Sequence, residues 1–574
     1  MQQFLQVQDA RAKRTYIPAT FEIEDWESLE VFYAHLLKKQ PKDQAELIQF
    51  LLERNEVEAM VAEEQAWRFI RMSCDTQDEQ KREAYQFFLK EIAPQVSRYD
   101  HKLNQQVASH PDFEQLPATP YLTLVRQIKR EIDLFREENV DLRSKAQTVA
   151  QQHGATNGAM TIEHEGETLT LQQAGKLMES RDRKLREEVW HKMSKRRTED
   201  REKLQGVFDE LLALRHQMAQ NAGYDSYTRY KFDALGRFDY QPEDVQAFHD
   251  SVAEVVAPIY QQMARQRKAA LGLDVLRPWD MSVDIFGESP LRPFEAADQL
   301  LTASIDCLSR LRPELGQMLQ IMDERGFLDL DSRIGKMPGG YNYPLMESGI
   351  PFIFMNAAGT QTDVNTMLHE SGHAIHSFLT GEIPLTALKH TPHEVSELAS
   401  MAMELMALDH YDAFYPDPEE CVRAKKEQIS RCLMILPWIA TVDAFQAWLY
   451  DHPTHTAAER NAQWKHLYHR FHGTEVSWDG YEDVLENLWL KQGHIFDVPF
   501  YYIEYAIAQL GSIAVWRNYK ADPQQGLDQY LAALQLGYTQ PIPELYATAG
   551  IRFDFSKAYI QECMDFCFAE YQKL

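Results

Sequence analysis

The sequence predicts a mostly α-helical protein, and three observations support that class. Apolar residues recur at helical spacing along most of the chain, as Leu124, Ile128, Ile132 and Phe135 show, with Lys and Glu between them. Only two short stretches have the alternation or the short apolar run that is typical of strands. A chain of 574 residues, 44% of them hydrophobic, is also long enough to bury a large core. We therefore expect a large helical body with a small β-sheet.

The two strand-like stretches differ in pattern. Residues 160–171, "MTIEHEGETLTL", alternate around a Glu-Gly turn and predict a β-hairpin. Residues 349–356, "GIPFIFMN", form an apolar run between Gly and Asn and predict a buried or half-buried strand. Pro351 near the start of this run favours an edge position, because proline cannot donate to a strand ladder.

Composition excludes several classes of protein. The formal net charge of -28, without any long basic run, argues against a nucleic-acid partner. The six cysteines form no CxxC pair, which argues against a thiolate zinc site and a disulfide framework. The first residues lack the apolar region of a secretory signal, and the longest apolar runs are too short to span a bilayer. We expect a cytoplasmic protein without a membrane partner, and a monomer as the default.

A change in composition suggests two domains. The stretch "QQHGATNGAM", residues 151–160, reads as a loop, and helical patterns resume after the predicted hairpin. We place the boundary near residue 190. The expected domains are an N-terminal helical domain, 1–190, which carries the hairpin, and a catalytic domain, 191–574.

Residues 366–378, "TMLHESGHAIHSF", place two histidines four positions apart. Thr362 or Asp363 can cap a helix that runs to about Thr380, where Gly381 supplies a stop. At 100° per residue, histidines four apart lie about 40° apart on one helix face, so both imidazoles can reach one ion.

The residues of this HExxH motif suit a catalytic zinc ion. Neutral imidazoles of His369 and His373 are good ligands for Zn²⁺, and a third protein ligand leaves one position for water, whose pKa the ion lowers. Glu370, directly after the first histidine, would then be the general base that accepts the proton of this water. The motif therefore predicts metal-assisted hydrolysis.

The third ligand has several candidates. The metzincin pattern fails, because His376 stands where it needs Gly and Leu379 where it needs His. A second helix is expected from about Glu394, and on it Glu394, Glu397 and Glu404 share one stripe. Periodicity alone does not choose among these glutamates, and a solvated acidic face is the alternative interpretation.

The segment "HESGHAIHSF" followed by "ELASMAMELM" resembles the M3 family of zinc oligopeptidases, the thimet oligopeptidase and oligoendopeptidase F group. The similarity is greatest to the bacterial oligoendopeptidase F and Pz-peptidase branch. The resemblance implies one Zn²⁺ per chain, with Glu397 as its third ligand and Glu404 as the partner that orients a ligating histidine.

Further segments extend the resemblance over the C-terminal part of the chain: "RDRKLREEVW", "GKMPGGYNYPLMESGIPFIFMN" and "HIFDVPFYYIEYAIAQLG". The last implies that His494, Tyr502 and Tyr505 stabilise the oxyanion of the tetrahedral intermediate, with Tyr501 a close competitor. A helix after Pro499 would place Tyr502 and Tyr505 on one face, although aromatic stripes at this spacing usually belong to a core.

The middle segment implies the substrate-binding residues. These are Gly339, Gly340, Tyr341, Phe352 and Phe354, together with Tyr501 of the last segment. The strand before the metal-binding helix would hold the substrate backbone as an edge strand, by β-augmentation. The two glycines suggest a loop that approaches the peptide closely and clamps it over the metal.

The family implies a two-lobed, helical, zincin-type metallopeptidase that encloses a deep channel. Its expected function is zinc-dependent cleavage of internal bonds in short unfolded peptides, with Glu370 as general base. Alternatives are a helical zinc carboxypeptidase or dipeptidyl carboxypeptidase, or a helical protein that binds a metal without catalysis. We interpret His376 as a packing or hydrogen-bonding residue, and His390 and His393 as solvated or capping residues.

Overall fold

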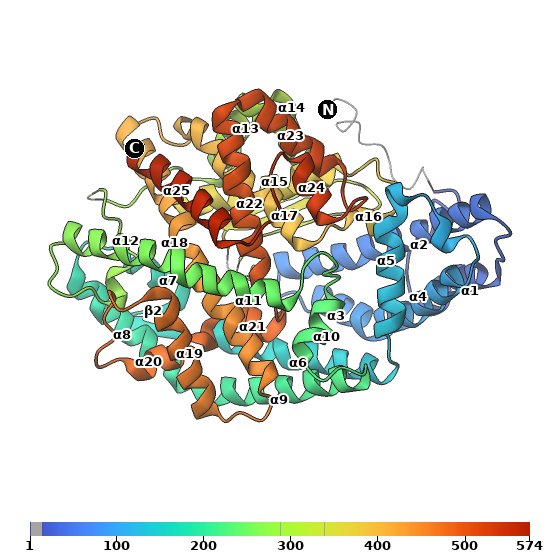
Figure 1. Cartoon of the computed structure of the whole chain (residues 1–574), viewed down its shortest axis with the longest axis horizontal. Helices are drawn as coiled ribbons and strands as arrows, with labels where there is room; N and C mark the ends of the chain where they lie inside the picture. Colours follow the sequence, from blue (N-terminus) through green and yellow to red (C-terminus); the bar gives the residue numbers. More distant parts are fainter. Residues whose placement is uncertain (2–13, 288, 334, 338) are drawn as a thin grey trace. The chain divides into compact units, whose positions relative to one another are not determined.

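The computed structural model describes residues 1, 14–287, 289–333, 335–337 and 339–574, and it is mostly helical, as predicted (Figure 1). Residues 2–13 of the predicted N-terminal domain and Pro338 of the predicted substrate loop lie outside the described residues. The chain divides into two compact units, each built from three separate segments. The boundary expected near residue 190 stays a prediction.

Unit 1 contains Met1–Phe135, Arg292–Ala424 and Gly511–Phe553. Its elements are α1 (Trp26–Lys38), α2 (Gln44–Cys74), α3 (Glu79–Phe87), α4 (Ala93–Ala108), α5 (Ala118–Leu134), α13 (Ala297–Leu311), α14 (Pro313–Glu324), β3 (Leu328–Asp331), β4 (Tyr341–Tyr343), β5 (Phe352–Ala357), α15 (Gln361–Leu379), α16 (Thr386–Lys389), α17 (His393–Met406), α23 (Pro523–Gln535) and α24 (Ile542–Thr548).

Unit 2 contains Arg136–Leu291, Lys425–Leu510 and Asp554–Leu574. Its elements are α6 (Glu138–Gly158), β1 (Thr161–His164), β2 (Glu167–Thr170), α7 (Leu171–Leu177), α8 (Arg183–Glu199), α9 (Arg201–Asn221), α10 (Tyr227–Ala234), α11 (Pro242–Ser251), α12 (Ala257–Ala270), α19 (Ala457–His472), α20 (Glu482–Glu486), α21 (Gly493–Asp497) and α25 (Lys557–Lys573). The chain passes between the units within α18 (Pro418–Asp451) and α22 (Tyr502–Ala521).

Short turns complete the helical structure: the π turns η3 (Phe88–Ile92) and η5 (Val252–Val256), and the 3-10 turns η4 (Phe113–Gln115), η6 (Pro278–Asp280), η7 (Ala407–Ala413) and η8 (Leu488–Lys491). Among the described residues, α18 alone is long and apolar enough to cross a membrane by composition, and 67% of its apolar window is buried inside the structure.

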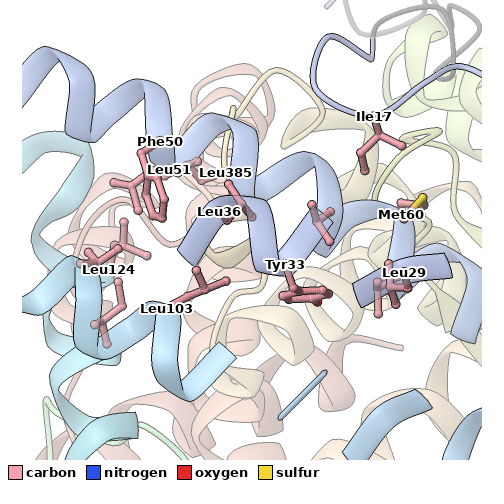
Figure 2. Close-up of a cluster of buried hydrophobic side chains, with 14 of the residues drawn as sticks. Ile17, Leu29, Tyr33, Leu36, Phe50, Leu51, Met60, Leu103, Leu124 and Leu385 are labelled. Atoms are coloured by element: carbon pink, nitrogen blue, oxygen red, sulfur yellow. The ribbon is translucent and has the colours of Figure 1, made fainter. Parts of the chain in front are cut away.

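The N-terminal helices of unit 1 share one hydrophobic core with the chain that follows the HExxH helix. Leu36, Phe50 and Leu103 are buried in this cluster, and so is Leu385, which lies between the two helices that carry the predicted metal ligands (Figure 2). The Asn55 side chain of α2 also donates to the Pro384 carbonyl, 2.8 Å away. The core therefore fixes the connection between those two helices.

The sheet of unit 1 corrects one prediction. Its strand order is β3-β5-β4, with β3 parallel and β4 antiparallel to β5, so the apolar run is the central strand and not an edge. Phe352, Ile353, Phe354 and Met355 are all buried, because both faces of a central strand are covered. Pro351 precedes the strand and so removes no ladder hydrogen bond. The edges of the sheet are β3 and the short strand β4.

The predicted hairpin is confirmed in unit 2. Strands β1 and β2 pair antiparallel, with Thr161 opposite Thr170 and His164 opposite Glu167. The turn residues Glu165 and Gly166 both have positive φ, 51° and 85°, as a two-residue type I′ hairpin turn requires.

A charged cluster holds the loop that leads into β4. Asp329 of β3 accepts two hydrogen bonds of 2.6 Å from Arg333 and one of 2.8 Å from the Lys336 ammonium, whose side chain is fully buried. Lys336 also donates to the carbonyl of Asp331 and lies over the Phe354 ring, 4.5 Å from its centroid. Partial burial alone would raise the pKa of Asp329, but the bonds from Arg333 and Lys336 outweigh it and lower this pKa.

We predict that Asp329→Asn destabilises unit 1 by about 1–3 kcal/mol at pH 7, because it leaves the buried Lys336 ammonium without its charged partner. Because the pKa of Asp329 is lower in the folded than in the unfolded chain, its ionised carboxylate stabilises the fold above about pH 4, the ordinary aspartate pKa. This stabilisation is lost as the pH falls below that value. Urea unfolding at pH 7 and pH 3 should show a large difference from wild type at pH 7 and a smaller one at pH 3. The neighbouring exposed Asp331→Asn is the control; an equal effect of the two changes would contradict the prediction.

Candidate metal centre

Helix α15 carries the HExxH motif, and its N-cap lies two residues before the earliest predicted cap, Thr362. Thr360 is the N-cap: its hydroxyl accepts from the Asp363 amide at 3.3 Å, and the Asp363 carboxylate accepts from the Thr360 amide at 2.8 Å. This is a capping box in which Asp363 is the third helical residue, so neither Thr362 nor Asp363 is itself the cap. The helix ends at Leu379 with Thr380 as its C-cap, close to the predicted end.

Helices α15 and α17 touch through their backbones at Gly372. A Cβ atom at Gly372 would lie 2.6 Å from Ser400 Cα and 2.7 Å from the Ala399 carbonyl oxygen, closer than real Cβ atoms approach. The Tyr530 hydroxyl donates to that same carbonyl at 2.6 Å. Only glycine permits this approach, which brings the side chains on the facing sides of the two helices together.

The approach brings two histidines and one glutamate to a common point. His369 Nε2 and His373 Nε2 lie 3.3 and 3.9 Å from Glu397 Oε2, and the candidate ligand atoms of the three residues lie within 4.8 Å of one another. Ligand atoms around one tetrahedral zinc ion are about 3.4 Å apart at ordinary bond lengths. A set of two imidazoles and one carboxylate at this separation fits a catalytic zinc site.

The three glutamates that the sequence left open occupy different positions. Glu397 joins the two histidines, and Glu404 Oε1 accepts from His369 Nδ1 at 2.7 Å. That bond orients the other ring nitrogen, Nε2, toward Glu397. Glu394 is buried, and its carbonyl oxygen accepts from the Tyr546 hydroxyl.

Burial and charge shift the pKa values of this cluster in opposite directions. Burial alone would lower the pKa of His369, but its bonds to Glu397 and Glu404 raise it well above the ordinary value. Burial lowers the pKa of His373 to about 3, so its imidazole is neutral, as a metal ligand must be. Burial, with repulsion from Glu397 and Glu404, raises the pKa of Glu370 to about 7. Glu370 can therefore take up and release a proton near neutral pH.

The predicted glycine loop passes directly over Glu370. Gly339 has φ of +103°, which favours glycine, and a Cβ at Gly340 would lie 3.1 Å from Thr366 Cγ2 and 3.9 Å from Glu370 Oε1. The Asn342 side chain of β4 donates to the Glu370 carbonyl at 3.4 Å. The loop backbone and β4 thus lie against the face of α15 that carries Glu370.

The aromatic residues predicted to contact substrate serve the packing of this sheet. The Tyr341 hydroxyl is 2.6 Å from Ser73 Oγ of α2, and its ring stacks on Phe354 with centroids 4.7 Å apart. Phe352 and Phe354 are buried, and Phe352 packs against Trp67. Their contact with a peptide stays a prediction.

The remaining histidines lie outside the ligand set. His376 is buried, and among the described residues its Nε2 atom has no hydrogen-bond partner. His390 follows the short helix α16, and His393 is the first residue of α17.

The predicted oxyanion residues form a cluster within unit 2. The His494 ring centroid is 4.9 Å from that of Tyr502 and 6.0 Å from those of Tyr501 and Tyr505. Tyr502 and Tyr505 lie on one face of α22, with ring centroids 5.5 Å apart. All four side chains are half-buried, so this is an accessible cluster and not an enclosed core.

Buried partners hold the start of α22. Phe500 has a positive φ of 67°, and its amide donates to Gln446 Oε1 at 2.9 Å. One helical turn later, Glu504 pairs with Arg237 at 2.7 Å, and both side chains are 2% exposed. The Trp438 indole donates to the Tyr502 hydroxyl at 3.2 Å. These contacts fix the direction of the tyrosine side chains.

The segment "RDRKLREEVW" has a structural function in unit 2. Arg183 and Arg186 both bind the fully buried carboxylate of Asp280, with distances of 2.8 to 3.0 Å. The Arg186 side chain also donates to the Trp279 carbonyl. This pair of arginines closes the turn η6 onto α8.

Comparison with known sequences agrees with the geometry. The sequence model of Peptidase family M3 matches residues 176–565, and that of the Peptidase M3 N-terminal domain matches residues 18–135. The chain belongs to peptidase family M3.

Two curated relatives are similar to this M3 chain at low sequence identity and over part of its length. The oligoendopeptidase F homolog of Mycoplasma pneumoniae is 27% identical over 335 residues, which are 53% of this chain and 52% of the relative. Oligopeptidase A of Escherichia coli is 25% identical over 283 residues, 37% of this chain and 40% of the relative. The chain thus spans about half or less of the length of these relatives.

Solved structures share the fold over nearly the whole chain. Pz peptidase A, solved with an inhibitor, superposes with a TM-score of 0.91 at 24% identity, covering 98% of this chain and 99% of that one. Oligoendopeptidase F from Enterococcus faecium gives a TM-score of 0.64 at 17% identity, with 96% and 97% covered. These likenesses confirm the predicted fold class of a mostly α M3 peptidase with small sheets.

Sequence patterns missed several residues on which the site of this M3 chain depends. Gly372 carried a usable signal, because a glycine inside a strongly helical stretch suggests a close backbone approach. No sequence pattern indicates the other residues, because each acts through a partner that is distant in the sequence; they are Ser73, Gln446 and Trp438.

We predict that Gly372→Ala destabilises unit 1 by about 1–3 kcal/mol and weakens metal binding, because its Cβ pushes α15 away from Ser400 and so separates the histidines from Glu397. Thermal melts with and without zinc measure both effects. The matched control is Gly206→Ala, a helical position with open space, which should stabilise by about 0.5–1 kcal/mol. Equal melting behaviour of the two variants would refute the backbone contact.

Glu404→Gln should keep the fold and weaken zinc binding by about 10–100-fold, because a neutral amide oxygen accepts from His369 Nδ1 more weakly than the carboxylate does. Competition with a zinc chelator measures the affinity. Glu394→Gln is the control, since this glutamate lies on the same helix away from the ligand atoms, and its affinity should stay near wild type. If Glu394→Gln lost more zinc affinity than Glu404→Gln, Glu394 and not Glu404 would be the residue that supports the metal ligands.

Proposed function

We propose that this M3 chain is a zinc-dependent oligoendopeptidase that hydrolyses internal bonds of short unfolded peptides. The observation that carries the proposal is the convergence of His369, His373 and Glu397 within 4.8 Å, with Glu370 next to His369 on α15. Glu370 is not among the clustered ligand residues, so its raised pKa suits proton transfer instead. The M3 relatives named oligoendopeptidase and oligopeptidase support the substrate class.

His369, His373 and Glu397 would hold the zinc ion, which when bound supplies Lewis-acid polarisation of the peptide carbonyl and lowers the pKa of water. Glu370 accepts the proton of the water that attacks the carbonyl carbon, and it then gives this proton to the leaving amine. Glu404 keeps His369 in the tautomer whose Nε2 faces the ion. The chain thus supplies ligands, a proton carrier and the orientation of both.

We assign recognition of the substrate backbone to the free edge of β4, in place of the central strand β5. Among the described strands β4 pairs only with β5, and its Asn342 contacts the carbonyl of Glu370. Main-chain hydrogen bonds along such an edge bind peptides of many sequences. Gly339 and Gly340 would let the loop before β4 lie close to the peptide.

His494, Tyr502 and Tyr505 would stabilise the oxyanion, with Tyr501 next to them in the same cluster. The proposal rests on the family resemblance and on the grouping of these four side chains in unit 2. Phenol O–H and imidazole N–H groups are suitable donors to developing negative charge. We also propose a cytoplasmic protein that acts on peptides as a monomer, without a nucleic-acid or membrane partner.

Glu370→Gln should bind zinc as wild type does and lose about 10²–10⁴-fold in peptide cleavage, because the amide cannot accept the proton. The measurement is mass spectrometry of a peptide pool of mixed length, incubated with the zinc-loaded proteins. Glu382→Gln, in the exposed loop between α15 and α17, is the matched control and should cleave normally.

The fragments distinguish the candidate functions. Internal cuts in short peptides only, absent in Glu370→Gln, support the oligoendopeptidase. Products shortened only at the C-terminus would replace it with a carboxypeptidase or dipeptidyl carboxypeptidase. Zinc binding without cleavage by the wild-type protein would leave a non-catalytic metal-binding protein.

A further inference from the structure

Unit 2 contains a small pocket that the proposed peptidase chemistry does not use. It lies between the C-terminal part of α8, the start of α9 and the segment from α20 to η8. One wall is apolar and includes Met160, Leu204, Val484, Leu488 and Leu490. The other wall carries three cations and several hydroxyl and amide groups, and no carboxylate lines the cavity.

The three cations are Arg197, Arg201 and Lys491, and none of them makes a hydrogen bond or an ion pair with a described residue. The nearby carboxylates serve other cations, since Asp200 pairs with Arg196 at 2.6 Å and Glu486 pairs with Lys465 at 2.8 Å. In a chain with 87 acidic and 59 basic residues, three unpaired cations around one cavity are unusual.

Three buried arginines elsewhere in unit 2 are paired with oxygen atoms. Arg186 binds Asp280, Arg215 donates to the Tyr450 hydroxyl and to backbone carbonyls, and Arg460 binds Gln205 and Asp209. A guanidinium has five N–H donors, and proteins satisfy them when they are removed from water. Arg197 is half-buried, which lowers its pKa, and it makes no hydrogen bond to a described residue of the kind that these arginines make.

The position of Lys491 fits the same interpretation. Its ammonium lies over the Trp438 ring, 5.0 Å from the centroid, which fixes its direction without neutralising it. The surrounding protein and the positive Arg197 together lower the pKa of Lys491 to about 8. A bound anion would remove the repulsion between these two cations and supply the missing acceptors.

We infer that this cavity is a binding site for a small ligand that carries an oxyanion next to an apolar group. Arg197, Arg201 and Lys491 would bind the oxyanion, with the Ser194 and Thr198 hydroxyls beside them. The apolar wall would cover the rest of the ligand. Planar guanidinium groups suit both carboxylate and phosphate oxygens, so the oxyanion has two sources that the experiment must separate.

The experiment uses the full chain and three probes: N-acetyl-leucine, its neutral amide and inorganic phosphate. Calorimetry measures the affinities, and trace acetylation with mass spectrometry measures the reactivity of Lys491 relative to Lys195. Lys195 is exposed on α8 and does not line the cavity, so it reports general labelling. Neither readout requires peptidase activity, so the result is independent of the proposed function.

We expect the acid to bind, the amide to bind at least about tenfold more weakly, and Lys491 labelling to fall to about a tenth when the acid is tenfold above its Kd. Arg197→Gln and Lys491→Met should each weaken binding by about tenfold or more, while Lys195→Gln should not. The two cavity variants remove different cations from different elements, so loss of folding in one leaves the other decisive.

The source of the oxyanion follows from the probes. Phosphate could bind more tightly than N-acetyl-leucine and be weakened by the same two substitutions. The oxyanion site would then stand, with phosphate as its ligand. Two results would overturn the inference. One is that neither anion protects Lys491 from acetylation. The other is that Arg197→Gln and Lys491→Met bind the anions as tightly as Lys195→Gln does.

Discussion

The candidate metal centre depends on one backbone contact, the approach of α15 to α17 at Gly372. The histidines lie on one helix and Glu397 on the other, so the separation of the two backbones sets whether the three side chains can share an ion. Any side chain at Gly372 would meet Ser400 Cα or the Ala399 carbonyl. Burial of Val364, Leu368 and Ile375 on α15 holds the helix in place but does not set this distance, which requires the absence of a side chain.

The same approach brings several buried carboxylates close together, and a bound divalent cation would offset their negative charge. Glu370, Glu397 and Glu404 are all buried near two imidazoles, of which His373 is neutral. The raised pKa values of His369 and Glu370 show that the chain's own groups favour extra protons there. A bound dication would supply this positive charge, and its field would lower the pKa of Glu370 and so favour the ionised carboxylate that a general base needs. Ligand geometry and base chemistry are therefore coupled.

Much of the site could be predicted from the sequence, because helical periodicity is local. The spacing of His369 and His373 specified one helix face, and that face does carry both imidazoles toward a common point. The choice among three glutamates could not be made from spacing, since it depends on where α17 lies against α15. The cap at Thr360 was missed because Thr362 and Asp363 are equally good cap residues, and only the structure shows which one bonds to the helix amides.

The error about β5 shows why strand order is harder to predict than strand existence. Pro351 suggested an edge, but it lies before the strand and leaves every ladder amide intact, while four consecutive buried residues required cover on both faces. The edge strands are then β3 and β4, and the Tyr341 side chain of β4 is already engaged, because it bonds to Ser73 and stacks on Phe354. What β4 has left to offer is its backbone. A peptide bound there would be recognised by main-chain groups that every sequence shares, so any preference for particular residues must come from elements other than this strand.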